Sequence, residues 1–96
     1  MTTSSATRSY TPVTALLREY RDRIARRKGK SQAQIARDAW LDESYVSRLL
    51  SGERDRPSRD ALILLGGWGL ELAVEEVDEL LMAADFKPLV LPASLR

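Results

Sequence analysis

The sequence predicts an all-α fold, a compact bundle of five helices. Five segments carry apolar residues at the three- and four-residue spacing of amphipathic helices, and most of them start at a residue that can cap a helix. No segment alternates apolar and polar residues as a half-buried strand does, and no repeat of about 20–50 residues is present. Two short helices joined by a tight turn, between Ser31 and Gly52, form the centre around which we expect the others to pack.

The first helix is predicted to begin at Thr11 and Pro12, because threonine caps helix N-termini and proline is favoured at the first helical position. Its last turn is basic, and Gly29 follows it, a residue suited to the left-handed conformation that ends many helices. Five apolar residues are expected to line its buried side: Val13, Leu16, Leu17, Tyr20 and Ile24.

The two ends of the chain differ from the helical part. Residues 1–10 are rich in Ser and Thr and show no periodicity, which predicts a disordered N-terminal tail, although Arg8 could reach a groove of nucleic acid as part of an arm. Residues 87–96 form an apolar tail that contains two prolines and so cannot be helical throughout. The helical domain is therefore expected at residues 11–86.

In the central pair, Ser31 and Gln34 have the spacing of a capping box, which places the start of the first short helix at Ser31. Asp42 is the expected cap of the second short helix, and Gly52 ends it. The residues predicted to face the core are Ile35, Ala36 and Ala39 in the first helix and Val46, Leu49 and Leu50 in the second.

Ser58 is the expected cap of a fourth helix, whose run Ala61–Leu65 is apolar on all sides and predicts deep burial. Gly66 and Gly67 weaken the end of this helix. A fifth amphipathic helix follows, with its acidic residues early, where the helix dipole favours them. Its apolar residues are Val74, Val77, Leu80, Leu81 and Ala84, and its polar side carries Glu75, Glu76, Asp78 and Glu79.

The composition excludes several classes of protein. A chain of 96 residues makes one domain, and it lacks Cys and His, which excludes disulfides, zinc sites built on these residues and histidine-based acid–base catalysis. We therefore expect no enzyme activity, no cofactor and no metal site. Apolar runs such as Ala61–Leu65 are too short to cross a bilayer, and the N-terminus lacks the apolar core of a secretory signal, so we expect a soluble cytoplasmic protein without a membrane partner.

Charge is distributed unevenly along the chain, although the net charge is only +1. Residues 1–30 carry eight Lys or Arg and two Asp or Glu, residues 31–59 carry five of each sign, and residues 60–96 carry two basic and seven acidic residues. Such a chain can present a basic face to a polyanion, although solvated helix faces would give the same composition.

The polar face of the second short helix, at about 43–51, has the character of a surface that reads base edges. Its outward residues are Glu43, Ser44, Ser47 and Arg48. Short polar side chains let a helix enter the major groove, and an arginine there can bond the O6 and N7 atoms of guanine. Ser44 and Ser47 discriminate weakly, whereas Glu43 could accept from cytosine N4 but would repel phosphates.

The stretch Gln32–Gly52 resembles the helix-turn-helix of the lambda-repressor-like family, also called the Cro or xenobiotic-response-element (XRE) type, and the similarity extends from about Val13 to about Leu89. The matching features are Ser31-Gln32, Ile35-Ala36, Ser44-Tyr45-Val46-Ser47-Arg48, Gly52-Glu53 and Pro57-Ser58. The resemblance implies a sequence-specific DNA-binding regulator of transcription, associated with the nucleoid, whose helix at about 43–51 enters the major groove of double-stranded DNA.

The resemblance also implies a role for individual residues. Glu43, Ser44, Ser47 and Arg48 would face base edges, and a second group would hold DNA phosphates: Gln32, Tyr45, Arg54, Arg56 and Arg59. For Arg54 and Arg56, a local ion cluster with Glu53 and Asp55 is the alternative. One recognition helix reads few base pairs, so we expect a homodimer or a partner protein, with helix five and the tail at 86–95 as candidate surfaces, and no small-molecule ligand.

The chain departs from the family at several positions. Many relatives have glycine where Trp40 stands in the turn, which predicts either a differently built turn or, as the favoured interpretation, a Trp40 that packs over the bundle. Ala25 and Leu50 replace a common Arg–Glu pair, and Asp85 replaces a glycine after the fifth helix.

A second function remains open from the sequence. A protein-interaction module that uses the helix-turn-helix fold to bind another protein would explain Asp42 and Glu43 at the head of the recognition helix, the two tryptophans Trp40 and Trp68, the acidic fifth helix and the apolar tail. Binding to random DNA at low salt would separate the two functions, because the interaction module has no need for it.

Overall fold

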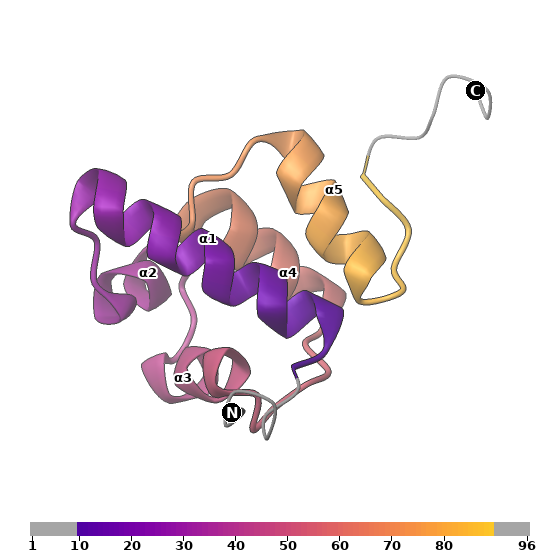
Figure 1. Ribbon diagram of the computed structural model, residues 1–96, viewed down its shortest axis with the longest axis horizontal. Coiled ribbons are helices and arrows are strands. Elements are labelled where there is room, and N and C mark those ends of the chain that lie inside the picture. Colours follow the sequence, from indigo (N-terminus) through magenta and orange to yellow (C-terminus); the bar gives the residue numbers. More distant parts are fainter. Residues whose placement is uncertain (1–9, 90–96) are drawn as a thin grey trace, which may run out of the picture.

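The computed structural model describes residues 10–89, and within this range it contains helices and connecting loops but no strand. Figure 1 shows α1 lying across the molecule, with α5 along one side, α3 along the other and α4 behind it. The elements are α1 (Pro12–Lys28), α2 (Gln32–Asp38), α3 (Glu43–Ser51), α4 (Arg59–Leu64), the π-helical turn η2 (Leu65–Gly69) and α5 (Val74–Ala83). The predicted all-α bundle of five helices is confirmed. Residues 1–9 and 90–96 of the two predicted tails lie outside the described residues.

The predicted caps account for where the helices begin. The side-chain oxygens of Thr11, Ser31, Asp42 and Ser58 each accept a hydrogen bond from the backbone N–H three residues later, at 3.1–3.3 Å. The expected return bond of a capping box is absent at Ser31, because the side-chain oxygen of Gln34 accepts from Arg37 at 2.6 Å instead, while its NH2 group donates to Asp38 at 2.7 Å.

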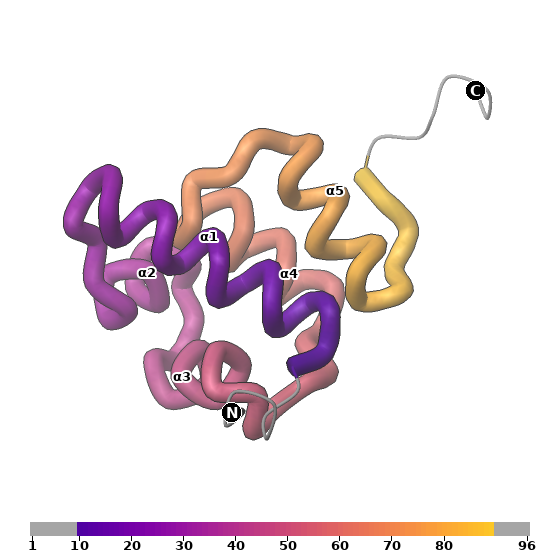
Figure 2. The backbone as a smooth tube through the Cα atoms, in the orientation of Figure 1, coloured from indigo at the N-terminus to yellow at the C-terminus, as the bar shows by residue number. Residues whose placement is uncertain are grey.

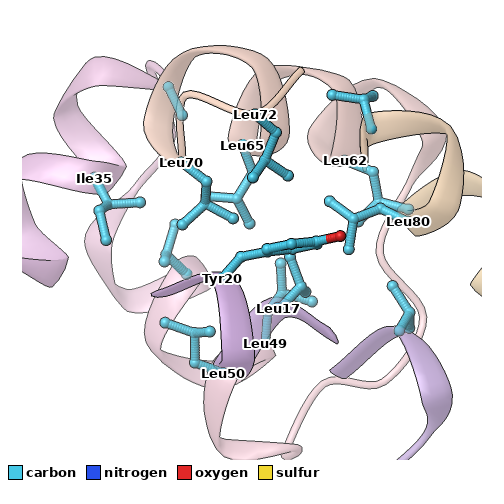
Figure 3. Close-up of a cluster of buried hydrophobic side chains, with 14 of the residues drawn as sticks. Leu17, Tyr20, Ile35, Leu49, Leu50, Leu62, Leu65, Leu70, Leu72 and Leu80 are labelled. Atoms are coloured by element: carbon cyan, nitrogen blue, oxygen red, sulfur yellow. The ribbon is translucent and has the colours of Figure 1, made fainter. Parts of the chain in front are cut away.

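The core is built where α1 crosses the other helices. Figure 3 shows the ring of Tyr20 lying among leucines, which include Leu62 of α4 and Leu80 of α5. Its hydroxyl donates to Glu79 at 2.6 Å, so the one polar atom of this side chain is satisfied. Burial and this hydrogen bond raise the pKa of Tyr20 above its ordinary value. The largest fully buried side chains are Leu17, Ile35, Leu49, Leu62, Leu65, Leu80, Leu81, Val46 and Thr14.

The end of α4 widens into η2 at the glycines that were expected to weaken it. The amide of Leu70 donates to the carbonyl of Leu65 at 2.8 Å, the five-residue spacing of a π turn. This turn packs directly on α2, because a Cβ atom on Gly69 would lie 2.8 Å from the carbonyl oxygen of Ile35. Gly69 therefore permits a close backbone approach that a larger residue would prevent.

The loop between α3 and α4 runs past the start of α1, as the chain path in Figure 2 shows. Pro57 in this loop is buried, and residues of the loop and of the α1 start line the same cleft, from Thr11 to Val13 on one side and Asp55 to Pro57 on the other. The loop is thereby held against the bundle while its arginines point to solvent.

Candidate nucleic-acid interface

The helix α3 separates an apolar face from a polar one. Val46, Leu49 and Leu50 are buried, as predicted. The four predicted base-reading residues, Glu43, Ser44, Ser47 and Arg48, are all exposed on the opposite side. A cap at each end, Asp42 before and Gly52 after, fixes the length of this face at about two and a half turns.

These four residues line one groove together with Gln32 at the start of α2 and Glu53 just after α3. The groove measures about 390 Å³. The structure thus brings Gln32, a phosphate-binding candidate from another helix, beside the predicted base-reading residues. The sequence analysis gave Glu53 no role at DNA: it named the residue as part of the family's Gly52-Glu53 feature and as an ion partner of the neighbouring arginines. Its position directly after the glycine that ends α3 is the signal that places it at this face.

The arginines on and after α3 are exposed, and none of them forms an ion pair with another of the residues 10–89. Among residues 10–89, no carboxylate oxygen lies within 4.0 Å of a guanidinium nitrogen of Arg48, Arg54, Arg56 or Arg59. The alternative of a local ion cluster with Glu53 and Asp55 is therefore wrong. These positive charges face solvent, where an anionic ligand can reach them.

Tyr45 links the recognition face to this loop. Its ring is half-buried against the core, and the guanidinium of Arg54 lies over it at 5.3 Å from the ring centre. The backbone N–H of Arg54 also donates to the carbonyl of Arg48 at 3.0 Å. Arg54 is thus held at the end of α3. Tyr45 positions Arg54 and also offers a hydroxyl group of its own.

Several basic residues of α1, unlike the arginines on and after α3, form ion pairs within the fold. Arg23 bonds both oxygens of Glu76 on α5, at 2.8 and 2.9 Å, which keeps the pKa of Glu76 below its ordinary value. Arg21 pairs with Asp22, and Lys28 pairs with Glu71. Part of the positive charge of the first third is therefore folded against the acidic last third, whereas Arg26 and Arg27 are exposed and have no carboxylate partner among residues 10–89. The predicted charge asymmetry is partly compensated within the fold.

A family model described as "Helix-turn-helix domain" matches residues 13–80. The chain belongs to this helix-turn-helix family. The family lies in the lambda-repressor-like group, so the group to which the resemblance pointed is confirmed. Searches of curated proteins and of solved structures found no significant match. Within residues 10–89, no helix is long and apolar enough to cross a membrane.

The turn of this helix-turn-helix contradicts the favoured interpretation of Trp40. Its φ is +58°, the left-handed conformation that glycine would adopt, and its side chain is 80% exposed. The amides of Trp40 and Leu41 donate to the carbonyls of Arg37 and Ala36, the bonding pattern of a Schellman motif. The turn is therefore built as it is with glycine, and Trp40 does not pack over the bundle.

Trp40 instead meets the second tryptophan at the surface. Its ring stacks on that of Trp68 in η2, with centroids 6.4 Å apart and planes inclined by 28°. Trp68 is itself 60% exposed. Two exposed aromatic rings in contact form an apolar surface that the helix-turn-helix presents beside its turn.

Lys30 holds η2 against α2 beneath this surface. Its ammonium group, on a side chain that is 6% exposed, donates to the carbonyl of Gly69 at 2.6 Å, to Asp38 at 2.7 Å and to Glu71 at 3.0 Å. Burial alone would lower the pKa of Lys30, but the hydrogen bonds to the two carboxylates outweigh burial and raise it. Sequence reasoning missed this cluster, because its acceptors come from two segments that lie far apart in the sequence, α2 and residues 69–71.

Proposed function

We propose that this chain is a sequence-specific DNA-binding regulator of transcription that inserts α3 into the major groove. The observation that carries the proposal is the concentration of unpaired arginines, Arg48, Arg54, Arg56 and Arg59, on and just after the exposed polar face of α3. Arg23, Lys28 and Lys30 are paired with acids of the fold, whereas these four arginines leave positive charge beside α3 that is available to DNA phosphates.

The proposed roles follow from side-chain chemistry. Arg48 bonds the O6 and N7 atoms of a guanine, while Ser44 and Ser47 donate to or accept from neighbouring base edges. Glu43 accepts from a cytosine amino group. A further group holds phosphates and sets the register of α3 in the groove: Gln32, Tyr45, Arg54, Arg56 and Arg59.

The acids at the groove shape the expected binding. Glu43 and Glu53 line it together with Arg48, so the groove itself offers no net positive charge. Attraction to phosphates then comes mainly from the loop arginines, and sequence selectivity from the groove. We expect affinity for random DNA to fall steeply with salt.

A single α3 reads few base pairs, so we infer that the chain acts as a homodimer or beside a partner protein. The exposed residues Val74 and Met82 on α5, and Leu89 after it, are the candidate apolar surface for this assembly. A DNA-binding regulator of this kind works in the cytoplasm in contact with the nucleoid.

Selection of bound sequences from a random DNA pool, followed by the variant Arg48→Ala, tests this proposal. We expect a site to be enriched, and Arg48→Ala to bind it about 10- to 100-fold more weakly, a loss of about 1–3 kcal/mol, with relaxed preference at one base pair. Arg26→Ala is the matched control, because Arg26 is an exposed arginine of α1. Equal losses on the selected site and on random DNA would contradict base reading.

The backbone of Trp40 favours a second candidate function, contact with another protein. A tryptophan in the left-handed conformation costs about 1 kcal/mol relative to glycine, and its exposed ring recovers little of this by burial. Strained residues that the core does not require occur at functional sites, and tryptophan is prominent in protein interfaces.

Two variants of Trp40 separate strain from contact. We expect Trp40→Gly to be more stable than Trp40→Ala by about 1 kcal/mol, because only glycine adopts this φ without cost. Both variants should bind selected DNA as the parent chain does, if the ring serves a protein partner. Chemical unfolding and DNA titration measure the two effects, and equal stability of the variants would show that the turn is unstrained. Absence of any DNA binding at low salt would favour the interaction module over the regulator.

A further inference from the structure

Tyr10, which precedes α1 in the chain, packs on the end of α3. A Cβ atom placed on Gly52 would lie 3.0 and 3.1 Å from the Cδ1 and Cε1 atoms of the Tyr10 ring. Gly52 also has a φ of +86°. The ring therefore covers the glycine that ends α3, and both the contact and the backbone conformation require glycine at this position.

Arg18 completes this contact from α1. Its guanidinium lies over the Tyr10 ring, 4.5 Å from the ring centre, and its Nη1 atom donates to the carbonyl of Leu50 at 2.6 Å. The carbonyls of the last turn of a helix have no partner within the helix, and a positive charge at that end is favourable. We refer to Tyr10, Arg18, Leu50 and Gly52 together as the α3 clasp.

The same end of α3 is the origin of the arginine loop. Gly52 and Arg54 donate their backbone N–H groups to the carbonyls of Leu49 and Arg48, at 3.3 and 3.0 Å. Three successive carbonyls are thus bonded, two by the loop and one by Arg18. Any displacement of the clasp would shift both the last turn of α3, which carries Arg48, and the loop, which carries Arg54 and Arg56.

We propose that Tyr10 and Arg18 are positioning residues for DNA recognition: they hold the C-terminal end of α3 and the arginine loop in the register in which base-reading and phosphate-binding side chains act together. This inference rests on the proposed function. It assigns Arg18 to the interior contact between α1 and α3 and not to a phosphate. Preorganisation of this kind raises affinity for the matching site, because the loop does not have to be ordered on binding.

The consequence differs between matching and random DNA. Random DNA is held by charge, and Tyr10→Ala removes none, so its affinity and salt dependence should be unchanged within about 2-fold. The selected site needs base contacts and phosphate contacts in one register, so its affinity should fall about 10-fold. A variant that only destabilised the whole fold would instead lower the affinity for both duplexes, because a smaller fraction of the protein would be folded.

The test compares four variants on the selected site and on a random duplex. Tyr10→Ala and Arg18→Lys should lose affinity for the selected site alone, the second because lysine keeps the charge but lacks the flat guanidinium that covers the ring. Tyr10→Phe keeps the ring and should bind as the parent chain does. Arg21→Gln is the matched control on α1, since Arg21 pairs with its neighbour Asp22.

Amide hydrogen exchange gives a readout that needs no DNA. In Tyr10→Ala the amides of Gly52 and Arg54 should exchange about 10-fold faster, with the core amides of α4 and α5 unchanged. Unchanged exchange at these two amides, or equal loss of affinity on both duplexes, would overturn the clasp. If no sequence is enriched from the random pool, the proposed function fails. If the enriched site is bound equally by the parent chain and Tyr10→Ala, the clasp alone fails.

Discussion

Two arginines of α1, Arg18 and Arg23, and the arginines that follow α3 have the same chemistry but opposite surroundings. On α1, Arg18 bonds a backbone carbonyl and Arg23 bonds a carboxylate of α5. In the loop after α3 and at the start of α4, Arg54, Arg56 and Arg59 have no carboxylate within 4.0 Å in the described part of the chain. The first group binds the fold together, and the second is open to an external anion.

This difference cannot be seen in the net charge of each segment of the sequence. Residues 1–30 carry most of the excess positive charge, yet part of it is paired with acids of α5 and of the segment before α5. Residues 31–59 are neutral overall, yet they expose their arginines. Net charge per segment therefore predicts the electrostatic surface poorly, because pairing depends on which helices meet.

The largest effect is expected at Lys30, another basic residue that is paired within the fold. Lys30→Met leaves the carbonyl of Gly69 and the carboxylates of Asp38 and Glu71 without their shared donor, so we expect the free energy of unfolding to fall by about 1–3 kcal/mol. Thermal unfolding followed by circular dichroism measures it. Arg26→Met is the control and should change stability by less than about 0.5 kcal/mol. A Lys30→Met protein as stable as the parent would show that the cluster is dispensable.

Removal of the unpaired group should affect DNA affinity and leave the fold intact. For Arg54→Ala combined with Arg56→Ala, we expect the slope of log affinity against log salt to become shallower by about 0.9 for each phosphate that the variant no longer neutralises. Stability should stay within about 1 kcal/mol, since the cation–π interaction of Arg54 with Tyr45 lies at the surface.

The matched control removes the same charge from α1, at the exposed residues Arg26 and Arg27. Fluorescence anisotropy on a random duplex at several salt concentrations compares the two double variants. A control that flattens the slope equally would show that net charge, and not the position of the loop arginines, drives binding.

The smallest effect is a dependence of stability on acid. Hydrogen bonds from Lys30, Lys28 and Arg23 lower the pKa values of Asp38, Glu71 and Glu76, respectively, from ordinary values of 3.8 for Asp and 4.5 for Glu. A carboxyl whose pKa is lower in the folded state stabilises the fold above its unfolded pKa, and this contribution is lost as the pH falls. We expect the melting temperature to be flat near neutral pH and to fall below about pH 5.

Lys30→Met provides the comparison for this prediction. It removes a donor to two of the three carboxylates, so its acid dependence should be weaker than that of the parent chain. Melting temperatures of both proteins over an acid series measure the difference, and identical profiles would exclude these ion pairs as the cause.

The fold could be predicted because its signals are local. Each cap, such as Ser58 before α4, acts within three residues of itself, and the spacing of Val46, Leu49 and Leu50 alone fixes which side of α3 is buried. The exposed face of α3 follows from the same spacing. For the candidate site, the sequence could therefore indicate which side chains reach solvent, and their roles at DNA remain predictions.

What the sequence could not indicate depends on contacts between distant segments. Of the two residues that replace the common Arg–Glu pair, Leu50 is buried and Ala25 is exposed. The polar link from α1 to this end of α3 is made instead by Arg18, about two turns before Ala25 in the helix. The Lys30 cluster likewise joins residues about 40 positions apart. The interpretation of Trp40 was wrong because its large apolar area favours burial, whereas the Schellman bonds fix the backbone and leave the ring no path to the core.

Both tryptophans of the chain stack on each other at the surface beside the turn of the helix-turn-helix. Tryptophan fluorescence from this protein therefore arises outside the core. It reports on the surroundings of Trp40 and Trp68 more directly than on global unfolding. A partner that binds at the turn will change the wavelength or the intensity of this fluorescence. A ligand held by α3 and the arginine loop contacts no tryptophan there. The molecule thus carries its own optical label on one surface, and this label can tell a partner at the turn from DNA at the recognition helix.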